Sequence, residues 1–247
     1  MKGIILAGGT GSRLYPLTKV TNKHLLPVGH YPMIFHAIHR LKQAGLTDIL
    51  IVTGKEHMGD VVNLLGSGTS LHVSFTYKVQ DEAGGIAEAL GLAEQYVGNE
   101  KCVVVLGDNV FEQDISAYIY KFKEQESGAK ILIQKVADPQ RFGVPELQGN
   151  KIISIEEKPT DPKSDYAVTG IYMFDSRVFE IIKTLTPSNR GELEITDVNN
   201  AYIKRNELTY DVLEGWWTDA GTHTSLAKAN ELAKDILFDE DFGKLKL

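Results

Sequence analysis

A regular alternation of short apolar runs with helical stripes restricts the fold of this sequence more than any other feature. Apolar runs typical of strands lie at 2–6, 48–53, 71–77, 101–106 and 129–136, and helical patterns separate them at 32–44, 61–65, 85–95 and 115–126. Each helical segment returns the chain to the start of another strand, so the alternation requires a largely parallel sheet with helices on both faces. The sequence therefore predicts an α/β fold.

The regular alternation of predicted strands and helices ends after Pro139. Strands are predicted at 151–156 and 167–174, and helices at 178–183, 195–204 and 222–237. The length suits one compact domain with insertions. We expect a single domain over 1–247, with lobes at about 1–138 and 139–221 and a closing helix at about 222–237.

Charge and cysteine content narrow the classes of partner. Lys and Arg total 26 against 33 Asp and Glu, a formal charge of -7, which repels nucleic acid and attracts cations. Cys102 is the only cysteine and excludes an intrachain disulfide, which favours a reducing cytoplasm. The N-terminal segment lacks a signal-peptide core, and no run approaches 18 apolar residues. We expect a soluble cytoplasmic protein without a membrane partner.

A glycine-rich loop, Ala7–Arg13, follows the first predicted strand directly. Glycines let backbone N–H groups approach a phosphate chain, and Arg13 adds a forked cation. Neither the dinucleotide fingerprint nor the P-loop signature is present, because Leu14 stands where a third glycine is needed and no Gly-Lys-Ser/Thr follows. A tight turn that needs positive φ is the alternative interpretation.

Two neighbouring stretches carry a more specific pattern. Leu6-Ala7-Gly8-Gly9-Thr10-Gly11-Ser12-Arg13-Leu14-Tyr15-Pro16-Leu17-Thr18, followed by Lys23-His24-Leu25-Leu26-Pro27-Val28, resembles the sugar nucleotidyltransferases, and within them the short thymidylyltransferases that act on glucose 1-phosphate. The resemblance extends from about residue 2 to about residue 230. It implies a Rossmann-like three-layer α/β/α sandwich with a mixed, mainly parallel sheet, the nucleotide-diphospho-sugar transferase fold. The first lobe would then bind the nucleotide and the second the sugar.

The resemblance also implies roles at the phosphates. The nucleotide-binding set would be Leu6, Gly8, Gly9, Gly11, Arg13, Gln80, Gly85 and Asp108, and the catalytic set Arg13, Lys23 and Lys158. Fixed cations suit this chemistry, because the transition state of phosphoryl transfer spreads negative charge over several oxygens. For Lys23 the alternative is a solvated loop lysine.

Two loop carboxylates, Asp108 and Asp219, lie 111 positions apart. Magnesium typically takes one or two carboxylates together with substrate phosphates, and the resemblance makes both residues Mg²⁺ ligands. The alternative is that Asp108 is a turn residue and Asp219 caps the helix that starts near Thr222. Sequence alone does not show whether the two carboxylates meet.

The loop Gln80–Ala89 resembles the base-reading loop of the family. Gln80 offers a donor and an acceptor to an imide edge, and the backbone of Gly85 would add a hydrogen bond. Ala83 stands where proline is common, and Glu88 where glutamine is common, so base preference is less securely implied than reaction type. A turn followed by a helix start is the plain alternative.

The resemblance implies a sugar site built from Asn109, Gly143, Glu157, Lys158, Val168 and Glu192. Lys158 would clamp the sugar phosphate. Phe142 replaces a tyrosine that is often found there, which removes any hydroxyl contact. Without the resemblance, Glu156-Glu157-Lys158 is the solvated end of a strand.

The predicted reaction joins dTTP and glucose 1-phosphate into dTDP-glucose and pyrophosphate with Mg²⁺, by in-line attack on the α-phosphorus. A uridylyltransferase and a non-catalytic nucleotide-sugar sensor are the alternatives. Relatives with extra C-terminal helices have a product-sensing site between subunits, which we do not expect here. A homo-oligomer remains an open alternative.

Overall fold

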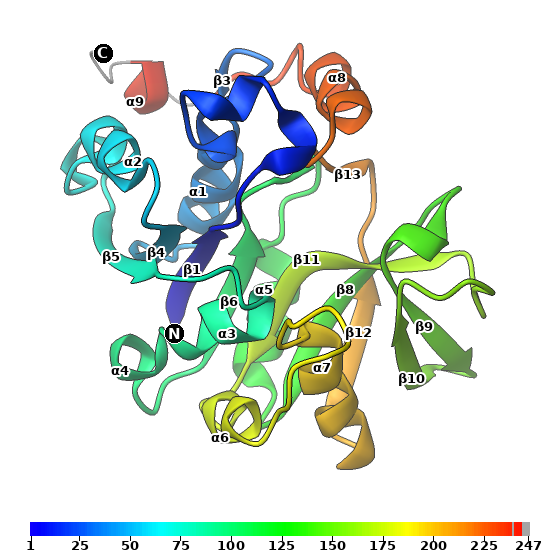
Figure 1. The fold of residues 1–247 in the computed structure, drawn as a ribbon. Coiled ribbons are helices and arrows are strands. Elements are labelled where there is room, and N and C mark those ends of the chain that lie inside the picture. Colours follow the sequence, from blue (N-terminus) through cyan, green and yellow to red (C-terminus); the bar gives the residue numbers. More distant parts are fainter. Residues whose placement is uncertain (239, 244–247) are drawn as a thin grey trace. The chain divides into compact units, whose positions relative to one another are not determined.

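The computed structural model describes residues 1–238 and 240–243 (Figure 1). These residues form two compact units. Unit 1 consists of Met1, Gly84–Val104 and Ala117–Glu214. Unit 2 consists of Lys2–Ala83, Val105–Ser116 and the described residues from Gly215 onward. Each unit therefore combines segments that are distant in the sequence.

Three parallel strands form the sheet of unit 2. β4 (Asp48–Gly54) lies between β1 (Lys2–Ala7) and β5 (Ser74–Gln80), and its residues pair in parallel register with both neighbours. The central residues of β1 and β4 are fully buried, as expected for strands that are covered on both faces. This part of the predicted parallel sheet is confirmed.

Two helices accompany these strands. α1 (Met33–Gln43) follows Pro32 and ends before Gly45, whose φ of 75° suits a helix stop. Its apolar stripe is fully buried from Met33 to Leu41. α2 (Met58–Leu65) is shorter and ends at Gly66. Both helices lie where the sequence pattern predicts them.

Short elements complete unit 2. Three 3-10 helices, η1 (Ser12–Leu14), η2 (Leu17–Lys19) and η3 (Lys23–Leu25), follow the glycine-rich loop, and η4 (Thr69–Leu71) precedes β5. Two antiparallel ladders pair β2 (Pro27–Val28) with β3 (Tyr31–Pro32), and β7 (Asn109–Phe111) with β13 (Trp217–Asp219). The described chain ends with α8 (His223–Leu232) and α9 (Glu240–Gly243).

One apolar cluster joins these short elements. It contains Leu14 of η1, Met33 of α1 and Val110 of β7, together with Ala220 and the inward side of α8. Burial of these side chains holds the loop region against α8, because apolar surface is removed from water on both sides of the contact. α8 therefore fixes the position of the segment that carries Arg13.

Unit 1 has its own strands and helices. Its strands follow the order β12 (Leu208–Val212), β8 (Ala129–Lys135), β11 (Tyr166–Phe174) and β6 (Cys102–Leu106), with β12 parallel and β11 antiparallel to β8. β9 (Gly143–Gln148) and β10 (Lys151–Glu157) form a separate antiparallel ladder after η5 (Pro139–Arg141). The helices are α3 (Ile86–Gly91), α4 (Glu94–Val97), α5 (Ser116–Glu124), α6 (Val178–Lys183) and α7 (Ile195–Lys204).

Three sequence predictions need correction. The helix predicted over 85–95 is split into α3 and α4 next to Gly91, a residue that weakens helices. The strand predicted over 71–77 starts only at Ser74, because His72 adopts a φ of 56° after η4. The helix predicted over 222–237 ends at Leu232, and the chain then turns so that Phe238 stacks on Tyr31, with ring centroids 4.3 Å apart.

Within the described ranges, no helix combines the length and the apolar character that crossing a membrane requires.

Candidate active site

The glycine-rich loop of unit 2 leaves β1 through a left-handed turn. Gly11 has a φ of 62°, and a Cβ at this position would lie 2.9 Å from Thr18 Cγ2, so a side chain is excluded for both reasons. Thr18 Oγ1 donates to the carbonyl of Gly11 over 2.8 Å. The loop is therefore held from the side of η2, and Arg13 follows it within η1.

Lys23 stands at the start of η3 and forms an ion pair with Asp108, with Nζ and Oδ2 2.6 Å apart. Asn22 caps this short helix, since its Oδ1 accepts from the backbone N–H of His24 over 2.9 Å. The amide of Asn22 also donates to the carbonyl of Ala7 over 3.4 Å. Lys23 is thus tied to the end of β1, which makes a freely solvated lysine the wrong interpretation.

The β7–β13 ladder brings the two predicted metal ligands together. Asp219 pairs with Asn109, and the backbone N–H of Ala220 donates to the carbonyl of Asp108 over 2.8 Å. Asp219 Oδ1 accepts from the backbone N–H of Gly221 over 2.7 Å. The cap of α8 is Thr222, which forms a capping box with Ser225, so Asp219 is not the helix cap.

Gly221 marks the point where three charged side chains converge. A Cβ on Gly221 would lie 2.7 Å from Asp219 Oδ1, 2.9 Å from Arg13 Nη2 and 3.5 Å from Asp108 Oδ2. Two carboxylates and a guanidinium therefore surround a position that only glycine leaves open. Gly221 was not among the residues predicted from the sequence, although it lies inside the motif that contains Asp219.

Electrostatics differ between the two carboxylates. Burial opposes ionisation of Asp108, but the charge of Lys23 and the hydrogen bonds from Lys23 and Asn109 outweigh it and hold the pKa of Asp108 well below its ordinary value. Burial, followed by the negative charge of Asp108, raises the pKa of Asp219. Burial also lowers the pKa of His24 to about 3, aided by the charge of Lys23, so His24 is neutral at pH 7.

Three further predicted residues lie in the same unit. A Cβ on Gly8 would meet Gln80 Oε1 at 2.6 Å, so the glutamine side chain lies directly over the glycine-rich loop. The carbonyl of Leu6 accepts from the backbone N–H of Gly107, beside Asp108. Asn109 Oδ1 accepts from the indole N–H of Trp217 over 2.7 Å. Trp217 is buried, and the hydrogen bond from its ring nitrogen has a structural role.

In unit 1, a carboxylate cluster forms around Glu157 at the end of β10. Thr196 Oγ1, in the first turn of α7, donates to Glu157 Oε2 over 2.7 Å. Gly143 pairs with Glu157 in the β9–β10 ladder, and a Cβ there would be 3.4 Å from the same carboxylate. Lys158 follows with a φ of 48°, and its ammonium lies 3.6 Å from Glu157 Oε1.

Arg190 organises three carboxylates of this unit. Its guanidinium lies 2.8 Å from Glu194, 3.2 Å from Glu192 and 3.6 Å from Glu157. Neither Arg190 nor Thr196 was predicted from the sequence as a site residue, although both lie in the stretch that contains Glu192. Arginine and threonine are common residue types and give no signal in the sequence. The role of both residues depends on where Glu157 lies in the folded chain.

Gly85 and Val168 are the remaining predicted residues of unit 1. A Cβ on Gly85 would lie 2.5 Å from the carbonyl of Leu193 and 3.1 Å from Cβ of Glu192, so the start of α3 touches the backbone beside Glu192. Val168 is buried on β11, opposite Ile133 of β8. Gly85 therefore lies beside the residues around Arg190, whereas Val168 is part of the buried sheet.

Comparisons with known proteins agree on one family. Residues 2–236 match the family model described as nucleotidyl transferase. A glucose-1-phosphate thymidylyltransferase of Neisseria meningitidis is 44% identical over 240 residues, which cover 96% of this chain and 83% of that protein. A Bacillus anthracis crystal structure of a candidate glucose-1-phosphate thymidylyltransferase in complex with a sucrose is 67% identical, with a TM-score of 0.95 over 98% of this chain and 99% of that chain.

A more distant solved structure, a UDP-glucose pyrophosphorylase complexed with UDP-glucose, is 25% identical, with a TM-score of 0.83 over 93% of this chain and 97% of that chain. The two structural matches confirm the predicted mixed α/β transferase fold.

Proposed function

Because the chain belongs to the nucleotidyl transferase family, we propose that it transfers a thymidylyl group from dTTP to glucose 1-phosphate and releases dTDP-glucose and pyrophosphate. The names of the relatives at 44% and 67% identity support this substrate pair. The structure named UDP-glucose pyrophosphorylase is only 25% identical, so its name is weaker support for a uridylyl donor. The observation that carries the proposal is the convergence of Arg13, Asp108 and Asp219 at Gly221.

We propose that Asp108 and Asp219 hold Mg²⁺. The donor set fits this ion, because both side chains offer the carboxylate oxygens that a hard cation prefers and substrate phosphates would supply further ligands. The electrostatics fit as well, since burial and then the negative charge of Asp108 raise the pKa of Asp219, and a divalent ion held by the two carboxylates would relieve their repulsion. When bound, the ion would neutralise charge on the triphosphate.

The groups of unit 2 fit a nucleoside triphosphate. In this proposal, Gly8, Gly9 and Gly11 present backbone N–H groups to the phosphates, while Arg13 and Lys23 compensate the charge that passes to the departing pyrophosphate. Gln80 lies over the loop, where its amide reads the base edge, and Leu6 borders the same end of β1. We also assign the backbone of Gly85 to base recognition.

The groups of unit 1 fit a sugar phosphate. Glu157 is oriented by Thr196 and accepts from sugar hydroxyls, and Glu192 acts in the same way. Lys158 binds the phosphate, while Gly143 and Val168 leave room for the ring. Asn109 is the remaining residue that we assign to sugar binding.

The chemistry requires no general base from the protein. The second ionisation of a phosphate monoester lies near pH 6, so the attacking oxygen of glucose 1-phosphate is already anionic at pH 7. The barrier comes from repulsion between two anions, and fixed cations lower it by positioning and charge compensation. Arg13, Lys23 and Lys158 are the residues that we assign to this task.

A coupled pyrophosphate assay tests the proposal. We expect turnover with dTTP, glucose 1-phosphate and Mg²⁺, loss of turnover with EDTA, and recovery when Mg²⁺ is restored. A higher kcat/KM with UTP than with dTTP would replace the thymidylyl assignment by the uridylyl alternative. Tight binding of dTDP-glucose without any pyrophosphate release would identify a sensor and refute the enzymatic proposal.

We also propose a cytoplasmic location, where nucleotides and sugar phosphates are available and thiols stay reduced. The single cysteine, Cys102, is fully buried, and burial raises the pKa of its thiol to about 12, which makes it unreactive. Fractionation of cells of the source organism, with recovery of the protein outside the cytoplasmic fraction, would contradict this location.

A further inference from the structure

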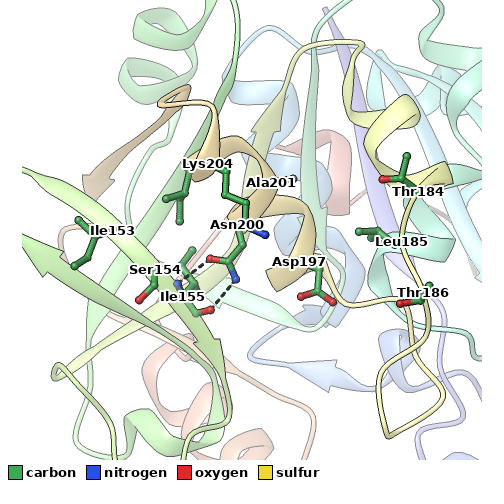
Figure 2. Close-up of a pocket in the computed structure, with 11 residues that line it drawn as sticks. Ile153, Ser154, Ile155, Thr184, Leu185, Thr186, Asp197, Asn200, Ala201 and Lys204 are labelled. Carbon is green, nitrogen blue, oxygen red and sulfur yellow. Dashed lines mark hydrogen bonds between the residues drawn. The ribbon is translucent and has the colours of Figure 1, made fainter.

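Unit 1 contains a pocket of about 610 Å³ that the proposed function does not use. It lies between β10, one face of α7 and the segment Thr184–Thr186 that follows α6, as Figure 2 shows. Its volume is within the range of small-molecule sites, which run from about 300 to 1,000 Å³. The pocket is therefore large enough for a ligand rather than for a few waters.

One wall of the pocket is held rigidly. Asn200 of α7 accepts from the backbone N–H of Ile155 over 3.0 Å and donates to its carbonyl over 2.8 Å, the two dashed lines in Figure 2. This double hydrogen bond fixes the helix against β10 without using other groups of the lining. A ligand would thus meet a pre-formed wall and would not have to order it.

Two side chains of opposite charge lie on this face of α7. Asp197 and Lys204 both line the pocket, and among the described residues neither side chain has a hydrogen bond or an ion pair. They are seven positions apart, which places them on one face of the helix about 10 Å from each other along its axis. The pocket therefore offers a strong acceptor at one end and a donor at the other.

The rest of the lining combines hydroxyl groups with aliphatic side chains. Ser154, Thr184 and Thr186 contribute hydroxyl groups, and Ile153 and Leu185 contribute apolar surface. Ile153 is 43% exposed, which is high for an isoleucine on a strand. Hydroxyl groups next to exposed aliphatic side chains suit a ligand that has both C–H faces and hydroxyl groups.

We propose that this pocket binds a neutral polyhydroxylated molecule of the size of a mono- or disaccharide, at a site separate from the residues assigned to the reaction. Its hydroxyl groups would donate to Asp197 and accept from Lys204, and its C–H face would pack on Ile153. A zwitterion is less suitable, because both charged side chains are exposed and ion pairs between exposed groups contribute little to binding. A ligand with a net charge would leave one of the two side chains unsatisfied or repelled.

Methyl NMR can test the proposal on the whole chain. Ile153, Ile155 and Ile203 all line the pocket and serve as local probes once isoleucine methyl groups are labelled. Maltose is the neutral probe, titrated through the millimolar range, and succinate, putrescine and 6-aminohexanoate are the charged comparators. We expect maltose to shift these three resonances in a saturable way, while Ile4 and Ile49, buried in unit 2, stay unchanged.

Variants localise the binding. Ala201→Trp fills the pocket and is expected to abolish the shifts, whereas the matched variant Ala201→Ser leaves them. Asp197→Asn is expected to weaken maltose binding roughly tenfold, because a hydrogen bond to a charged carboxylate becomes a weaker one to a neutral amide oxygen. Unshifted pocket resonances with maltose, shifts that survive Ala201→Trp, or saturable binding of a charged comparator in place of maltose would each overturn the proposal. Pyrophosphate release is measured separately, so failure here is distinct from failure of the proposed function.

Discussion

Substitution of Gly221 by alanine tests the convergence of the charged side chains directly. The new Cβ would lie 2.7 Å from Asp219 Oδ1 and 2.9 Å from Arg13 Nη2, which falls short of the 3.4 Å of ordinary contact by 0.7 and 0.5 Å. Both atoms are the tips of side chains, and Gly221 does not need a positive φ, so the backbone accommodates alanine. The fold should survive while the charged groups move apart.

The size of the effect follows from these distances. A misplacement of about 1 Å at a reacting centre costs roughly a hundredfold in rate. Displacements of 0.5 to 0.7 Å should therefore lower kcat by about ten- to twenty-fivefold, which corresponds to roughly 1.4 to 1.9 kcal/mol in the activation barrier. The assay is pyrophosphate release from dTTP and glucose 1-phosphate at saturating Mg²⁺.

Gly59→Ala provides the matched control. Gly59 lies in α2 of the same unit, and nothing stands within 4 Å of the Cβ that would be added. This variant should keep full activity and gain about 0.4 to 1 kcal/mol of stability. Wild-type kcat in a folded Gly221→Ala protein would show that the arrangement around Gly221 is not required for the reaction.

Three other predictions follow from the same structure. Asp108→Asn should lower kcat by about a hundred- to a thousandfold and raise the Mg²⁺ concentration for half-maximal rate, measured by titration; an unchanged Mg²⁺ dependence would contradict its role as a ligand. Thr196→Val removes the 2.7 Å hydrogen bond to Glu157 and should raise KM for glucose 1-phosphate roughly tenfold with KM for dTTP unchanged, so equal changes in both would argue against a role on the sugar side. His36 is buried and bonded to the carbonyl of Val28, and burial lowers its pKa from 6.5 to about 4. Between pH 4 and 6.5 the unfolded chain binds more protons at this histidine than the folded chain does. The stability that neutral His36 contributes is therefore fully present above pH 6.5 and falls by up to about 3 kcal/mol as the pH drops toward 4. His36→Gln should lose this part of the pH dependence in urea unfolding, and identical pH slopes for both proteins would refute the assignment.

Strong periodicity explains which elements could be predicted from the sequence. α1 has a continuous apolar stripe bounded by Pro32 and Gly45, and β1 and β4 are uniformly apolar, so local pattern and burial agree. β7 and β13 have three residues each, too few for any period to be detected. β12 alternates exposed and half-buried residues and carries no apolar run, which is why it was not predicted.

The candidate site was predictable only in part, for a related reason. Glycines and charged residues within recognisable motifs pointed to Arg13, Lys23 and Asp108, but the proximity of Asp108 to Asp219 depends on a ladder between distant segments. Arg190 was overlooked because its role depends on where its three carboxylate partners lie after folding. Motifs report residue types, whereas convergence is a property of tertiary structure.

The β7–β13 ladder also affects when the protein becomes competent during its synthesis. The glycine-rich loop, Lys23 and Asp108 leave the ribosome more than 100 residues before Asp219 and Gly221, which lie on the other strand of the ladder and just after it. Bacterial and eukaryotic ribosomes add roughly 5 to 20 residues per second, so a nascent chain spends several seconds with one carboxylate and no partner. An unfinished polypeptide therefore carries the glycine-rich loop and Asp108 before the second carboxylate and the helix that packs against the loop segment have been made.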